Sequence, residues 1–138
     1  MIIAGAGNDL VCARGGNDIV FGGPGNDTLN GDEGNDGLSG GDDLQTPADE
    51  VNYLDGGPGS DTLYGSGGTD YLTATTDEYP SAHPDVLYGG AGADQLEARN
   101  GHHDTIGGGP GDDRCRFDPE DGPVTEFGYT DYSREDTP

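Results

Sequence analysis

The stretch GGPGNDTLN, Gly22 to Asn30, recurs almost letter for letter as GGPGSDTLY from Gly56. Looser copies follow as GGAGADQLE from Gly89 and as GGPGDDRCR from Gly108. Each copy places a glycine-rich run before an aspartate, and one apolar residue two positions after that aspartate. Recurrence of a short unit at a fixed period indicates a solenoid built of stacked repeats.

A nine-residue frame that begins at Ala4 divides the chain up to Arg116 into eleven units, eight of them nine residues long. The unit from Ala98 has ten residues, and the units from Gly40 and Ala74 are much longer. The sixth position of the units reads Asp9, Asp18, Asp27, Asp36, Asn52, Asp61, Asp70, Asp85, Asp94, Asp104 and Asp113. The eighth position is always apolar: Val11, Val20, Leu29, Leu38, Leu54, Leu63, Leu72, Leu87, Leu96, Ile106 and Cys115, with Ile2 in a partial unit before the frame.

The residue types explain what one unit can form. Gly-Gly-x-Gly provides the positive φ angles of a tight turn. The last three residues are often β-branched or aromatic and suit a short strand, in which the central side chain points to one face and its neighbours to the other. One such unit cannot bury its single apolar side chain alone, whereas a stack of units can.

The composition and net charge of the chain exclude several classes of binding partner. The 138 residues carry 28 Asp and Glu against 5 Lys and Arg, for a net charge of −23. This balance excludes nucleic acid and anionic membrane surfaces as partners, because both need basic side chains. No apolar run is long enough to span a membrane, and the opening MIIAGAGNDLV lacks the basic region of a signal peptide. Disorder would also fit the composition, but it does not require apolar residues in strict register.

The pattern Gly-Gly-x-Gly-x-Asp-x-apolar-x resembles the haemolysin-type calcium-binding (RTX) nonapeptide repeat. The resemblance covers Ala4 to Arg116 and implies an all-β fold, a right-handed parallel β-roll in which each unit is half a coil. Units two apart would then stack, and alternate units would turn on opposite edges. We therefore expect a β-roll of about eleven half-coils over residues 1–116, with two loop insertions, and a C-terminal cap or tail over residues 117–138.

The resemblance also implies a ligand set. One loop supplies the carbonyls of positions 2 and 4 and the carboxylate of position 6, and the loop one coil later supplies the carbonyls of positions 1 and 3 and its own aspartate. Such all-oxygen sites are those that Ca²⁺ prefers. The residues so assigned are Gly5, Gly7, Asp9, Gly16, Asp18, Gly22, Gly23, Pro24, Gly25, Asp27, Gly31, Glu33, Gly34, Asp36, Gly56, Pro58, Asp61, Gly68, Asp70, Asp85, Gly89, Gly90, Ala91, Gly92, Asp94, Asp104, Gly108, Pro110 and Asp113.

We expect about five well-formed calcium sites, where both loops of a pair are regular. These pairs are Asp9 with Asp27, Asp18 with Asp36, Asp36 with Asp61, Asp70 with Asp94, and Asp94 with Asp113. Four further pairs involve a long unit and stay open, partly because Asn52 lacks a charge.

Other features have simpler interpretations. The insertions Asp42–Val51 and Thr75–Pro84 are expected to be surface loops rather than a ligand-binding lip. His102, His103 and Asp104 form no known zinc motif and are expected in a solvated turn. Cys12 and Cys115 lie about five coils apart, roughly 24 Å at ~4.8 Å per coil, which is too far for a disulfide. We expect Cys115 in the core and Cys12 exposed.

The sequence thus predicts a non-enzymatic module that binds calcium and is folded by it, in a secreted or cell-surface protein. No nucleophile–base pair is visible, and calcium is the only cofactor expected. The alternative is an accessory targeting or polysaccharide-binding module of a larger secreted enzyme or toxin. Calcium ions are the expected partners, together with a larger parent protein or a cell-surface ligand.

Overall fold

The computed structural model describes residues 1–41, 50–74 and 83–118, and within these ranges it contains strands and turns but no helix. The part of the chain so described accordingly offers no helix that could cross a membrane. The strands are β1 (Ile2–Ile3), β2 (Leu10–Cys12), β3 (Ile19–Phe21), β4 (Thr28–Asn30), β5 (Gly37–Ser39), β6 (Tyr53–Asp55), β7 (Thr62–Gly68), β8 (Tyr71–Thr73), β9 (Val86–Gly92), β10 (Gln95–Ala98), β11 (Thr105–Gly107) and β12 (Arg114–Phe117).

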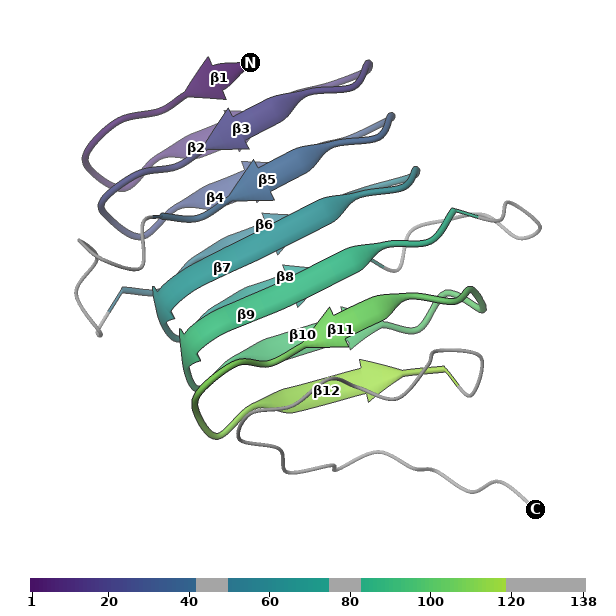
Figure 1. Ribbon diagram of the computed structural model, residues 1–138. Coiled ribbons are helices and arrows are strands. Elements are labelled where there is room, and N and C mark those ends of the chain that lie inside the picture. Colours follow the sequence, from purple (N-terminus) through teal and green to yellow (C-terminus); the bar gives the residue numbers. More distant parts are fainter. Residues whose placement is uncertain (42–49, 75–82, 119–138) are drawn as a thin grey trace.

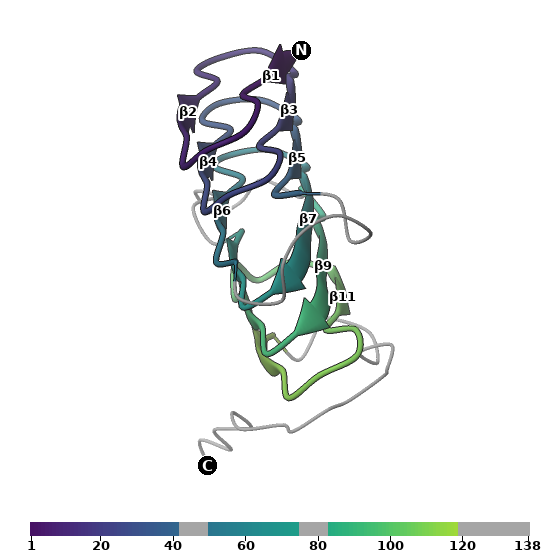
Figure 2. The same ribbon diagram turned by 90° about the vertical axis from the view of Figure 1, so that its left-hand side faces the viewer.

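The strands form two parallel sheets, and the chain crosses from one sheet to the other at every turn (Figure 1). The odd-numbered strands form one six-stranded sheet in the order β1-β3-β5-β7-β9-β11. The even-numbered strands form the other, in the order β2-β4-β6-β8-β10-β12. In the side view the two sheets appear as two facing rows (Figure 2). Each strand therefore pairs with the strand two units away, which confirms the expected all-β parallel roll.

The register of the strands follows the eighth position of the repeat. In the odd-numbered sheet Val20 pairs with Leu38, and Leu38 with Leu63. The long units do not disturb this register, since Leu29 pairs with Leu54 across the first insertion and Leu63 with Leu87 across the second. Most of each insertion, residues 42–49 and 75–82, lies outside the described residues, so the expectation of surface loops remains a prediction.

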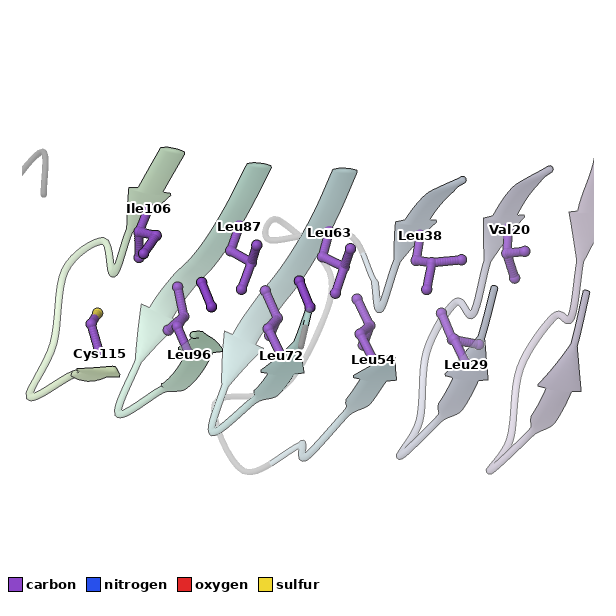
Figure 3. Packing of buried hydrophobic residues seen from close by; sticks show 12 residues of the cluster. Val20, Leu29, Leu38, Leu54, Leu63, Leu72, Leu87, Leu96, Ile106 and Cys115 are labelled. Carbon is purple, nitrogen blue, oxygen red and sulfur yellow. The ribbon is translucent and has the colours of Figure 1, made fainter. Parts of the chain in front are cut away.

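Apolar side chains of the eighth position form the core. From Val20 to Cys115 they are at most 3% exposed and meet between the sheets in two facing rows (Figure 3). Ala74 and Ala98 are also buried in this cluster. Ile2 and Val11 are only partly buried, because no described coil covers them on their outer side. The free thiol of Cys115 is buried and that of Cys12 is exposed, as the sequence predicts.

The outer faces of the sheets carry the flanking residues of each strand. Tyr53 stacks on Tyr71 with ring centroids 4.8 Å apart, and Tyr64 stacks on Tyr88 at 5.4 Å. Such cross-strand aromatic pairs stabilise neighbouring strands. Because side chains alternate along each strand, the inner face of each sheet carries the apolar core and the outer face carries a tyrosine pair.

The structure differs from the expected pattern of short strands at two places. Strands β7 and β9 each span seven residues and continue through Gly-rich segments in which the sequence predicts turns. Ser66 pairs there with Gly90, and Gly68 with Gly92. Successive loops stack closely enough for strand pairing to continue around the edge of the roll. Of the expected cap or tail, only Phe117 and Asp118 are described, and Phe117 packs against the core.

Candidate metal centre

The position-6 residues form two rows, one along each edge of the roll. The first row contains Asp9, Asp27, Asn52, Asp70, Asp94 and Asp113, and the second contains Asp18, Asp36, Asp61, Asp85 and Asp104. All except Asp9 and Asp18, in the first coil, are buried. Turns that lead into the even-numbered strands carry the first row, and turns that lead into the odd-numbered strands carry the second. The topology therefore brings together acidic residues that are 18 to 25 positions apart in sequence.

A continuous hydrogen-bond ladder runs along each row. The backbone N–H of every member donates to the Oδ1 atom of the next member, at 2.7 to 3.0 Å. Asn52 takes part in the same way, because its Oδ1 accepts the N–H of Asp27 at 2.9 Å. The ladder therefore uses one side-chain oxygen of each residue that accepts a bond, and leaves the second oxygen of each accepting aspartate for another partner.

The second oxygen has no hydrogen-bond donor at several of these aspartates. Within the described residues this holds for the Oδ2 atoms of Asp9, Asp27, Asp36 and Asp113. Burial raises the pKa of Asp27, Asp36 and Asp113, although the backbone N–H that each accepts partly offsets the effect. A buried carboxylate oxygen without a donor or cation is unfavourable. A bound cation would remove this cost.

The first glycine of a unit leaves the space next to that oxygen open. A Cβ atom added at Gly31 would lie 2.5 Å from Asp36 Oδ2 and 2.5 Å from the carbonyl oxygen of Gly56, one coil later. Gly22 and Gly89 occupy the same position relative to Asp27 and Asp94. At these three glycines, a carboxylate of the same unit and a carbonyl of the following coil thus converge on a space that a side chain would fill.

Backbone carbonyls complete the surroundings. The position-1 and position-3 carbonyls face the preceding coil, where they accept N–H groups of positions 2 and 4. Examples are Gly5 N–H to Gly22 O at 3.0 Å and Gly7 N–H to Pro24 O at 2.8 Å, and Glu33, Pro58 and Pro110 accept in the same way. The position-2 and position-4 carbonyls face the following coil, where Gly23 and Gly25 have positive φ angles. Carbonyls of both loops therefore line the space between successive coils.

Two aspartates are exceptions, since their Oδ2 atoms accept side-chain hydrogen bonds. Ser66 Oγ donates to Asp70 Oδ2 at 3.3 Å, and Asn100 Nδ2 donates to Asp85 Oδ2 at 3.1 Å. The sequence reasoning missed Ser66 and Asn100. The available signals were a serine at a position-2 site usually held by glycine, and the extra residue in the unit from Ala98.

The donor set matches a hard cation. No group of three or more His, Cys, Asp or Glu side chains gathers as a metal cluster in the described ranges. The candidate sites therefore consist of carboxylates together with backbone carbonyls, which are the donors that Ca²⁺ prefers. Of the His102–Asp104 stretch, only Asp104 enters a row, while His103 is exposed.

Comparison with known proteins identifies the same repeat. The sequence model of a family described as the RTX calcium-binding nonapeptide repeat matches four segments, residues 1–20, 13–43, 49–77 and 82–115. These segments contain every member of both rows. No curated protein and no solved structure matches the chain.

Proposed function

Because the chain belongs to the RTX calcium-binding nonapeptide repeat family, we propose that it is a calcium-folded module of an extracellular protein. One observation carries the proposal: buried Oδ2 atoms such as that of Asp36 lack a donor and face a space that the adjacent glycine leaves open. The residues present fit calcium, because every available donor at these positions is an oxygen.

In the second row, an ion between the loops of Asp36 and Asp61 would be held by these two carboxylates and by loop carbonyls such as that of Gly56. When bound, calcium supplies positive charge between stacked carboxylates that otherwise repel one another. The chain's own residues fix the donors, because the ladder holds each carboxylate by its Oδ1 atom. Five ions would change the net charge of −23 to −13.

Calcium binding is large enough to decide whether the chain folds. Each nine-residue unit buries one apolar side chain, so the core is thin for the backbone that it must order. At a free calcium concentration of about ten times Kd, each site adds ~1.4 kcal/mol, and five sites add ~7 kcal/mol. A typical domain has a total stability of ~5–15 kcal/mol. Calcium thus acts as a folding switch.

The expected calcium affinity also indicates in which compartment the module folds. Extracellular calcium modules bind with Kd values of ~10⁻⁴–10⁻³ M, far above cytosolic calcium. The module would stay unfolded inside the cell and would fold after export.

Circular dichroism of the full chain in excess chelator, followed by calcium titration, tests the proposal. We expect little β signal in chelator and cooperative gain of β structure as calcium reaches the millimolar range. Magnesium at the same concentration is the control, because it is smaller and demands regular octahedral geometry. A complete β spectrum in excess chelator would falsify the folding switch.

The outer face of the even-numbered sheet favours a second candidate, a polysaccharide-binding role. A shallow hollow there is lined by residues that include Tyr71, Gln95, Arg99, Arg114 and Arg116. Three of the 5 basic residues of the chain therefore lie on one face, next to a stacked tyrosine pair. Arg99 and Arg116 each form an ion pair with Glu97 in the same hollow, so Arg114 is the residue to test. Affinity electrophoresis in a polyuronate gel tests this role, with retardation expected for the calcium-loaded chain and its loss in Arg114→Ala. Equal mobility with and without polyuronate would refute it.

A further inference from the structure

The units that carry the two insertions differ from the regular units in how they contact the next coil. We call the contact between two successive loops of a row a junction and name it by its two position-6 residues. In a regular junction such as Asp36–Asp61, the Oδ2 atom of Asp36 has no donor in the described structure. In two other junctions, Asn52–Asp70 and Asp85–Asp104, a side-chain amide group occupies this region.

At the Asn52–Asp70 junction, Asn52 Nδ2 replaces the second carboxylate oxygen. It donates to Ser66 Oγ at 2.9 Å, and Ser66 Oγ lies 3.3 Å from Asp70 Oδ2. Asn52, Ser66 and Asp70 are all at most 3% exposed. A Cβ atom added at Gly40 would lie 2.8 Å from Asn52 Nδ2 and close to the carbonyl oxygen of Gly65. The amide nitrogen therefore occupies the space that a carboxylate oxygen faces at a regular junction.

The orientation of the Asn52 amide follows from its partners. Its Oδ1 atom accepts the N–H of Asp27 at 2.9 Å, so the remaining atom must be the NH₂ group. An NH₂ group carries no lone pair for a cation and directs its positive end toward it. Compared with a regular junction, the Asn52–Asp70 junction thus lacks one oxygen ligand, and its NH₂ group repels a cation.

At the Asp85–Asp104 junction, the amide comes from the later coil. Asn100 Nδ2 donates to Asp85 Oδ2 and to the carbonyl of Ala74, both at 3.1 Å. Its Oδ1 atom accepts the N–H of His102, which again fixes the orientation. Ala74 stands at position 1 of its unit, where six of the eight nine-residue units have glycine. The amide NH₂ therefore bridges two oxygens that would otherwise face an ion.

We propose that these two junctions are closed by side-chain amides and bind no calcium. The inference rests on the proposed calcium function and deepens it by assigning which junctions stay free of metal. The two junctions lie on opposite edges, and each begins at a unit interrupted by an insertion. Replacement of a cation by a neutral hydrogen-bond bridge removes the need for a regular glycine loop, which is the part that an insertion disrupts.

Counting the calcium ions bound to the intact chain by native mass spectrometry tests the proposal. Asn52→Asp replaces the NH₂ group with an oxygen and should bind one ion more than the wild type. Asn100→Asp should also gain one ion, because its carboxylate then converges with Asp85 and Ala74 O. Asn17→Asp makes the same charge change at an exposed loop position and keeps its Oδ1 acceptor for Asn35 N–H, so its count should equal the wild-type count.

In Asn52→Asp alone, the hydroxyl group of Ser66 still lies in the junction. The double variant Asn52→Asp/Ser66→Gly removes this hydroxyl group as well. A gain of one ion in this variant or in Asn52→Asp, with none in Asn17→Asp, supports the amide bridge at the first junction. If all four variants bind the wild-type number or fewer, the amides do not exclude calcium and the proposal is overturned. A wild type that binds no calcium would refute the proposed function instead, so the two failures are distinguishable.

Discussion

Gly31 shows how the absence of one side chain creates a space for an ion. Its φ angle is not in the positive region that disfavours other residues, so backbone strain is not the reason for a glycine here. The reason is steric, since a Cβ would meet Asp36 Oδ2 and the Gly56 carbonyl at 2.5 Å each. Gly31 thus leaves open the space beside the Asp36 carboxylate, which a side chain at this position would fill.

Substitution of this glycine tests that explanation. Gly31→Ala should remove one bound calcium ion and lower stability by ~1.4 kcal/mol at calcium of about ten times Kd, because the methyl group fills the site. Isothermal titration calorimetry gives the number of ions, and thermal melts in calcium give the stability. Gly15→Ala is the matched control, since its Cβ would meet nothing closer than 3.9 Å. Equal calcium numbers in the two variants would contradict a steric role of position 1.

At the scale of the strands, the repeat period of the sequence predicts the register in which the strands pair. The apolar eighth position places Leu38, Leu63 and Leu87 in one register, and the pairings confirm it through an insertion. The register is well determined because a shift of a strand by one residue would turn all its apolar side chains toward solvent. Two-apart stacking, which the family resemblance implies, then predicts the two aspartate rows.

The contacts of the interrupted units could not be predicted in the same way. Ser66 and Asn100 contact partners 14 and 15 residues away in the sequence, and both stand at positions to which the repeat motif assigns no side-chain contact. The stacking of Tyr64 on Tyr88 is similar, because this pair spans the second insertion and follows from the register only after that insertion has been placed. Local periodicity predicts the regular coils, whereas side-chain bridges between irregular units need coordinates.

For the whole molecule, the buried carboxylates link stability to pH. Burial raises the pKa of Asp27, Asp36 and Asp113 above the ordinary value, and repulsion from Asp9, Asp18, Asp32 and Asp112 adds to this. A carboxyl group whose pKa is higher in the folded state stabilises the fold when it is protonated. This contribution is complete below the unfolded-state pKa and is lost as pH rises through the folded-state pKa.

The metal-free chain should therefore gain β structure as the pH is lowered from neutral to about 5 in excess chelator. This range stays above the sequence isoelectric point of about 4.1. The calcium-loaded chain should respond in the opposite direction, because protons compete with calcium for the same oxygens. Circular dichroism in chelator and calorimetry in calcium measure the two trends. Loss of β signal on acidification in chelator would show that the buried carboxyls do not oppose folding.

The direction of the hydrogen bonds between strands also gives the roll a mechanical character. These bonds run along the axis of the stack, from each coil to the next (Figure 1). A force that pulls the two ends apart therefore loads one outer coil at a time, like peeling, instead of shearing all coils together. A regular coil of 18 residues releases ~60 Å of chain at ~3.3–3.6 Å per residue. Under tension the molecule would lengthen in discrete, nearly equal steps, with a longer step at each coil of 25 or 24 residues.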